Sequence, residues 1–133
     1  MFEITVESEF CSAHAILIAG KREPAHGHNW HVTLALAGDR LDADGLLLDF
    51  HALERTLADV LGPFRNADLN KTPPFDRLNP SAENVARHIA DSVSRALSLS
   101  GPAPNNPVRV AWVRLTEAPG CAVVYRPPCS PAP

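Results

Sequence analysis

Apolar and polar side chains alternate over residues 2–7 of the chain. This two-residue repeat predicts a strand with one buried face. The same alternation over residues 30–36 predicts a second strand. Residues 108–116 and 121–125 predict two more strands, on either side of the turn-forming sequence Ala118-Pro119-Gly120.

Two stretches between these strands have the longer period of an amphipathic helix. In the first, Asp49 is a suitable N-cap, apolar residues recur at helical spacing over 50–60, and Gly62-Pro63 is a stop signal. The second begins with Pro80 as a first-turn proline and ends near Gly101. The order strand, strand, helix, helix, strand, strand predicts an α+β domain. We expect a four-stranded antiparallel sheet with both helices on one face.

The length and composition limit the class of protein. The 133 residues correspond to one domain, which we expect to occupy residues 1–126, followed by a proline-rich, irregular tail over 127–133. Lysine and arginine total 12 against 15 acidic residues, and no basic stripe is visible, so no nucleic-acid partner is expected. The apolar runs are too short to span a membrane.

The N-terminus shows no secretory signal, so we expect a cytoplasmic protein. The cysteines agree with this expectation, because Cys11, Cys121 and Cys129 are odd in number and have no paired spacing. Cys11 is expected to be a packed thiol, and no role is visible for the other two.

Three of the six histidines form a pattern that is typical of a metal site. His26 and His28 are two residues apart, so both imidazoles leave the same face of an extended backbone. His14 lies at the end of the first predicted strand, and an antiparallel neighbour would bring it beside that pair. Three imidazoles can bind zinc and leave a fourth position open for water or substrate.

A simpler interpretation of the same histidines is a hydrogen-bonded pair on a strand with no metal. Gly27 would permit a tight backbone in either case. The remaining histidines are expected to be at the surface or to have local hydrogen-bond partners: His31, His51 and His88.

Six short motifs occur in a fixed order along the chain. They are Phe10-Cys-Ser-Ala-His14, His26-Gly-His-Asn-Trp30, Gly45-Leu-Leu-Leu-Asp-Phe50, Leu69-Asn70, Pro80-Ser-Ala-Glu-Asn84 and Thr116-Glu117. Together they resemble the 6-pyruvoyl tetrahydropterin synthase and 6-carboxytetrahydropterin synthase family, over nearly the whole chain up to about Tyr125.

The resemblance implies a fold, an assembly and a site. The fold is the tunnelling fold (T-fold), in which the sheets of three subunits close a barrel and two trimers usually stack; the open edges of an isolated four-stranded sheet also favour such closure. The resemblance implies zinc on His14, His26 and His28. It also implies that Glu117 binds the pterin ring, beside the zinc of an adjacent chain. Without the resemblance, Glu117 would be an ordinary charged residue at a strand end.

The chain departs from the family pattern at the residues that transfer protons. The stretch before His26 lacks the family's cysteine base, and the family's Asp-His pair is replaced by Arg65-Asn66. Arginine stays protonated and asparagine does not titrate, so neither relays a proton. Glu23 is the candidate substitute base, as in relatives that cleave the dihydroneopterin side chain by a retro-aldol reaction; a solvated loop residue is the equal alternative.

The resulting hypothesis is a zinc-dependent lyase that acts on the side chain of a dihydroneopterin-type substrate with altered proton-transfer residues. Two alternatives stay open at this point. One is a pterin-binding protein without turnover, and the other is a zinc enzyme with a new substrate such as an aldehyde. The pathway, tetrahydrobiopterin or deazaguanine synthesis, is also left open.

Overall fold

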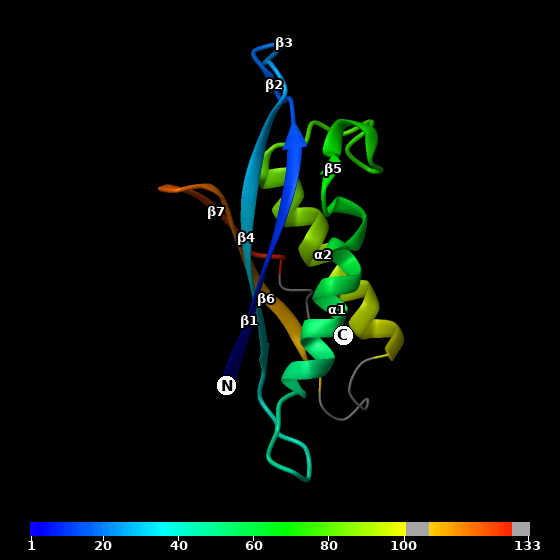
Figure 1. The fold of residues 1–133 in the computed structure, drawn as a ribbon. Coiled ribbons are helices and arrows are strands. Elements are labelled where there is room, and N and C mark those ends of the chain that lie inside the picture. The colour runs from blue at the N-terminus through cyan, green and yellow to red at the C-terminus, as the bar shows by residue number, and fades with distance from the viewer. Residues whose placement is uncertain (101–106, 129–133) are drawn as a thin grey trace.

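The computed structural model describes residues 1–100 and 107–128. Five strands form one sheet in the order β5-β1-β4-β6-β7, and two helices cover one of its faces (Figure 1). The strands of this sheet are β1 (Phe2–His14), β4 (His26–Gly38), β5 (Ala67–Asp68), β6 (Arg109–Ala118) and β7 (Cys121–Tyr125). The predicted α+β class is confirmed, with both helices on the same face.

The prediction of four antiparallel strands is wrong in one respect. β5 adds a fifth strand, which pairs in parallel with β1 at Ser12 and Ala13, so the sheet is mixed. A strand of two residues has no periodicity that a sequence pattern could reveal. The sequence also did not predict the small hairpin of β2 (Leu17–Ile18) and β3 (Lys21–Arg22), which joins β1 to β4.

The two long strands β1 and β4 pair in register along their whole length, and β4 extends further at both ends than the predicted residues 30–36. Their antiparallel ladder runs from Phe2 opposite Gly38 to His14 opposite His26. The first strand ends at His14, as predicted. The last rungs of this ladder therefore carry the candidate metal ligands.

The helix signals are confirmed for α1 (Phe50–Leu61) and shifted for α2 (Ala82–Ser100). The Asp49 carboxylate accepts a hydrogen bond from the backbone N–H of His51 at 3.0 Å, as expected of an N-cap. Pro80 lies before the first turn of α2 and not within it. Ser81 is the capping residue, because its hydroxyl oxygen accepts from the backbone N–H of Asn84 at 3.3 Å.

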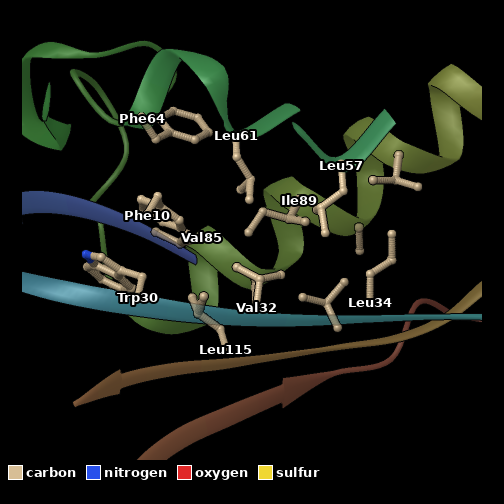
Figure 2. Close-up of a cluster of buried hydrophobic side chains, with 14 of the residues drawn as sticks. Phe10, Trp30, Val32, Leu34, Leu57, Leu61, Phe64, Val85, Ile89 and Leu115 are labelled. Carbon is tan, nitrogen blue, oxygen red and sulfur yellow. The ribbon is translucent and has the colours of Figure 1, made fainter. Parts of the chain in front are cut away.

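The apolar core lies between the sheet and the two helices (Figure 2). Trp30, on β4, is fully buried and connects this core with the histidines: its ring stacks on Phe10 and meets the His14 ring edge-on at 4.9 Å. Its indole N–H donates to the backbone oxygen of Ser12 at 3.2 Å. Each large apolar side chain buried in this way contributes roughly 1.5–3 kcal/mol, which holds the strands beneath the site.

The predicted irregular tail falls mostly on residues 129–133, which lie outside the described residues, so it stays a prediction, as does any role of Cys129. Among the described residues, neither helix combines the length and the apolar character that crossing a membrane requires.

His88 is the one histidine that α2 places in the apolar layer. Its ring meets the rings of Phe64 and Phe75 edge-on at 5.6 and 5.4 Å, and its Nε2 lies 3.4 Å from the Ser92 hydroxyl. Burial lowers the pKa of His88 below 6.5, the nearby Arg95 lowers it further, and Asp91 opposes the shift. The imidazole is therefore held neutral in the folded protein.

We expect the His88→Leu variant to lose less stability in acid than the wild-type protein does. Since the unfolded chain binds the proton at a higher pH than the folded one, the wild type is destabilised as the pH falls below about 6.5. Leucine keeps the apolar contacts and has no proton to gain. Melting temperatures of both proteins without metal, at pH 7.5 and pH 5, measure the difference. Equal losses in the two proteins would contradict the assignment.

Candidate metal centre

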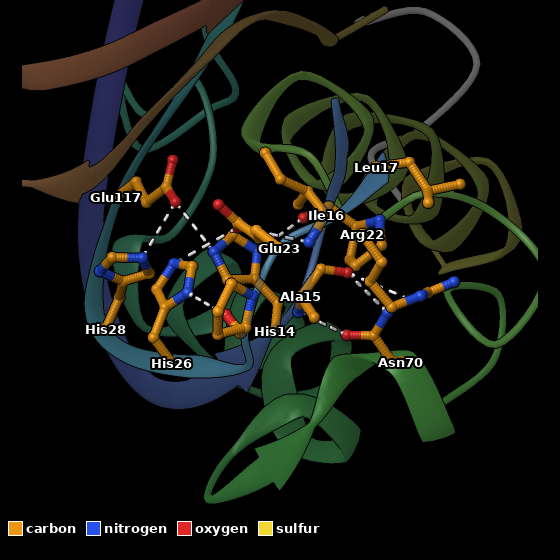
Figure 3. A network of polar contacts seen from close by, with 12 residues as sticks. His14, Ala15, Ile16, Leu17, Arg22, Glu23, His26, His28, Asn70 and Glu117 are labelled. Carbon is orange, nitrogen blue, oxygen red and sulfur yellow. Dashed lines mark hydrogen bonds and ion pairs between the residues drawn. The ribbon is translucent and has the colours of Figure 1, made fainter. Parts of the chain in front are cut away.

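The three histidines of the predicted site converge at one end of the β1–β4 ladder (Figure 3). His14 is the last residue of β1 and pairs with His26, the first residue of β4. His28 follows two positions later, opposite Ser12, and points to the same side. The antiparallel neighbour that the sequence required is thus present.

The rings lie close together and are shielded to different degrees. Their centroids are 4.8 Å apart for His14 and His26, 5.0 Å for His14 and His28, and 4.6 Å for His26 and His28. The His14 side chain is completely buried, whereas those of His28 and His26 are 19% and 38% exposed. The cluster therefore has a closed side at His14 and a side that solvent reaches at His26.

Backbone carbonyls fix the orientation of two of the imidazoles. The Nδ1 of His14 lies 2.8 Å from the oxygen of Pro80, and the Nδ1 of His26 lies 2.9 Å from the oxygen of Pro24. Because a carbonyl oxygen only accepts, each Nδ1 carries the proton and donates it. In the neutral ring, the Nε2 lone pair then points into the cluster, which is the arrangement that metal-binding histidines use.

Glu117, near the end of β6, completes the cluster from within the same chain. Its Oε1 lies 2.9 Å from the Nε2 of His14 and 3.0 Å from the Nε2 of His28. In the part of the chain that the structure describes, neither of these buried nitrogens has a hydrogen-bond partner. Because the Nδ1 of His14 carries the proton, its Nε2 presents a lone pair to the carboxylate oxygen and the two atoms repel each other, so a cation between them, either a proton or a metal ion, would stabilise the arrangement.

The protonated form of the His28 imidazole is disfavoured. Burial lowers the pKa of this imidazole, the neighbouring His14 and His26 lower it further, and only the carboxylates of Glu117 and Glu23 oppose the shift. One ligand atom from each of His14, His26, His28 and Glu117 lies within 4.8 Å of the others, so the four side chains could hold a metal ion.

Glu117 was expected beside the metal of an adjacent chain, and this placement concerns an assembly and stays a prediction. Within its own chain, the carboxylate contacts His14 and His28. The cause is local: β4 pairs with β6 up to His31 opposite Thr116, which leaves the next residue beside the histidines.

Glu23 lies at the exposed edge of the cluster and is not fully solvated. Its Oε1 is 3.6 Å from the Nε2 of His26 and accepts a hydrogen bond from the backbone N–H of Ile16 at 3.3 Å, and 27% of the side chain is exposed. It follows the β2–β3 hairpin directly, so this hairpin brings it to the histidines. The carboxylate is in position to accept a proton from a molecule bound beside His26.

Two residues that the sequence predicts to be unable to relay a proton, Arg65 and Asn66, contact the first strand. Arg65 donates through Nη1 to the backbone oxygen of Glu9 at 2.8 Å, and the backbone N–H of Asn66 donates to the oxygen of Cys11 at 2.7 Å. They line a surface pocket together with Cys11 and Asn29. The expectation that Cys11 is packed is wrong: its side chain is exposed, because it lies on the sheet face that no helix covers.

The remaining histidines agree with the interpretation made from the sequence. His31 is exposed and pairs with Glu9 at 3.3 Å, and His51 is exposed and pairs with Glu54 at 3.2 Å. The sequence did not reveal the carbonyls of Pro24 and Pro80 as partners of the candidate ligands. Every residue has a carbonyl, so only the fold could identify these two.

Comparison with known proteins adds the family. A family model described as 6-pyruvoyl tetrahydropterin synthase matches residues 3–128. The chain belongs to the 6-pyruvoyl tetrahydropterin synthase family. It is 34% identical over 132 residues to 6-carboxy-5,6,7,8-tetrahydropterin synthase of Bacillus subtilis (strain 168), with 95% of this chain and 86% of that protein covered. The chain is therefore a member of a family of pterin-processing enzymes.

Solved structures of the same family share the fold of this chain. The 6-pyruvoyl tetrahydropterin synthase of Caenorhabditis elegans superimposes with a TM-score of 0.76 at 21% identity, over 96% of this chain and 97% of that one. That of Plasmodium vivax, in a variant with alanine at a catalytic glutamate, gives a TM-score of 0.67 at 18% identity, over 93% and 96% of the two chains. These similarities establish the T-fold of the single subunit.

Proposed function

We propose that the protein is a zinc-dependent enzyme that acts on the side chain of a dihydroneopterin-type pterin. The observation that carries the proposal is the cluster of His14, His26 and His28 with Glu117, in which the Nε2 lone pair of His14 faces a carboxylate oxygen and a cation would relieve their repulsion. The imidazole nitrogens of His14, His26 and His28 can bind zinc and leave a fourth position open for water or substrate. Zinc, when bound there, polarises a substrate oxygen and makes neighbouring protons more acidic.

The Glu117 carboxylate is proposed to bind the guanidine-like edge of the pterin ring. A carboxylate suits this edge because it accepts two parallel N–H donors. The side chain is 24% exposed, so one face of the carboxylate is reachable from solvent. A pterin bound to Glu117 lies next to the histidines, and its side chain then extends toward the open side of the cluster at His26.

Glu23 is proposed to be the base. In a retro-aldol cleavage, it accepts the proton of the C2′ hydroxyl, the C1′–C2′ bond breaks as the C2′ carbonyl forms, and the bonding pair is delocalised into the pterin ring. C1′ then takes up a proton, which gives a 6-hydroxymethyl pterin and a two-carbon aldehyde. The Plasmodium vivax relative, whose catalytic residue is a glutamate, supports a glutamate in this role.

The replacement of the Asp-His pair by Arg65-Asn66 favours a second candidate, a pterin-binding protein without turnover. Product analysis separates the two functions. The zinc-loaded protein is incubated with dihydroneopterin and, separately, with its triphosphate. We expect cleavage of the side chain that stops when a chelator removes zinc, and little or no 6-pyruvoyl tetrahydropterin. Tight pterin binding with no product would support the second candidate and refute the first.

The assembly is proposed to be a trimer or a dimer of trimers, as in the family's barrel. The outer edge of β1, opposite its edge with β4, supports this, because among the described residues β5 pairs with this outer edge only at Ser12 and Ala13. A free edge of this length is a pairing surface. Sedimentation should give a mass of three or six chains. A stable monomer at micromolar concentration, with zinc bound, would contradict the proposed barrel.

A further inference from the structure

Two of the three residues after His14, Ala15 and Leu17, are hydrogen-bonded on one side by side-chain amides. The Oδ1 of Asn70 accepts from the backbone N–H of Ala15 at 2.7 Å, and its Nδ2 donates to the oxygen of Ala15 at 2.8 Å (Figure 3). Asn79 repeats this pair of bonds two residues later, with the N–H and oxygen of Leu17 at 2.8 and 3.2 Å. Each asparagine amide thus bonds to both the N–H and the C=O of one residue, as a neighbouring strand would. Residues 15–17 are called segment 15–17 below.

The opposite side of segment 15–17 is held by Glu23. The backbone N–H of Glu23 donates to the oxygen of Ile16 at 3.0 Å, and the N–H of Ile16 donates to the Glu23 carboxylate at 3.3 Å. Because backbone groups alternate in direction along an extended chain, Ile16 faces Glu23 while its two neighbours face the asparagines. The segment therefore joins His14 and Glu23 to the two amides.

Asn79 is itself held firmly and is connected with His14 by a second route. Its backbone oxygen accepts from the Nδ2 of Asn84 at 2.9 Å and from the N–H of Ser81 at 2.8 Å, at the start of α2. The next residue, Pro80, supplies the carbonyl that accepts from the Nδ1 of His14. A shift of Asn79 would thus move both the segment and the partner of the imidazole.

We propose that Asn70 and Asn79 are positioning residues of the metal centre, which set the placement of His14 and of the Glu23 carboxylate through segment 15–17. The inference rests on the proposed function and deepens it. It gives a role to Asn70 of the Leu69-Asn70 motif and to Asn84 of the Pro80–Asn84 motif, whose side chain donates to the backbone oxygen of Asn79. Changes in the outer partners of metal ligands typically lower metal affinity about 10- to 100-fold.

The test uses Asn70→Asp and Asn79→Asp, which keep the size of the side chain. Aspartate still accepts from the backbone N–H, but it places an oxygen against the backbone oxygen that the amide satisfied. The matched control is Thr72→Val, which removes a hydrogen bond of the same loop, from the Thr72 hydroxyl to the oxygen of Asp68 at 2.8 Å, and touches neither segment nor cluster.

Zinc affinity is measured by competition with a chromogenic chelator, and the visible spectrum of the cobalt-substituted protein reports the ligand geometry. We expect both aspartate variants to bind zinc at least about tenfold more weakly, with an altered cobalt spectrum. The Thr72→Val variant should keep both properties even if its melting temperature falls. Wild-type affinity and spectrum in the aspartate variants, or an equal loss in the control, would overturn the inference. A wild-type protein that binds no zinc would instead refute the proposed function.

Discussion

His28→Ala is expected to remove most of the bound zinc. The substitution takes away one of three imidazoles that the β1–β4 ladder holds in place, and it also removes one of the two nitrogens that face the Glu117 carboxylate. His28 lies on a strand and is 19% exposed, so alanine there leaves the apolar core intact. The imidazoles of His14 and His26 that remain are too few to hold the ion, because zinc in proteins almost always has four donors.

Metal content after gel filtration, measured by atomic absorption, checks this expectation. The wild type should retain about one zinc per chain. His31→Ala is the matched control, because His31 lies on the same strand, points to the opposite face and has a side chain that is exposed and pairs with Glu9. It should retain the full amount. Stoichiometric zinc in the His28 variant would show that the ion binds elsewhere.

Glu23→Gln is expected to abolish side-chain cleavage while zinc and pterin binding remain. Glutamine has the same shape, and its amide oxygen can still accept from the backbone N–H of Ile16, so the hairpin keeps its place. It cannot accept a proton at neutral pH. Loss of a general base typically lowers the rate about 10²- to 10⁴-fold.

The rate of product formation, together with zinc content and pterin affinity, distinguishes a base from a structural residue. Glu54→Gln is the control, since Glu54 is exposed on α1 and its carboxylate pairs with His51, which is not one of the three histidines of the cluster. Its rate should equal that of the wild type. An unchanged rate in the Glu23 variant would exclude it as the base, and a loss of zinc there would point to a structural role.

The sequence predicted those elements in which one face is buried, because burial of one face gives the apolar residues a regular spacing. Both long strands and both helices bury one side against the other layer, so their apolar residues recur at the period of the element. β5 and the β2–β3 hairpin consist of two-residue strands, which have no period. The start of α2 was placed too early because a proline before a helix and a proline in its first turn look alike in sequence.

The candidate site was predictable where ligands lie on adjacent strands. An antiparallel pair brings the end of one strand to the beginning of the next, so His14 and His26 could be expected to meet. Glu117 was reached only through the family resemblance, since it comes from a strand more distant along the chain. The amides of Asn70 and Asn79 contact segment 15–17 across 55 and 62 residues, and no spacing rule predicts such contacts.

The central claim is that the three histidines and Glu117 form one zinc and pterin site. Diffraction at the zinc absorption edge, from crystals of the zinc-loaded protein grown with dihydroneopterin, tests it most directly. The account predicts one anomalous peak per chain, bonded to the Nε2 atoms of His14, His26 and His28, with the pterin ring edge at Glu117. A zinc peak away from these nitrogens, or a pterin bound away from Glu117, would contradict it.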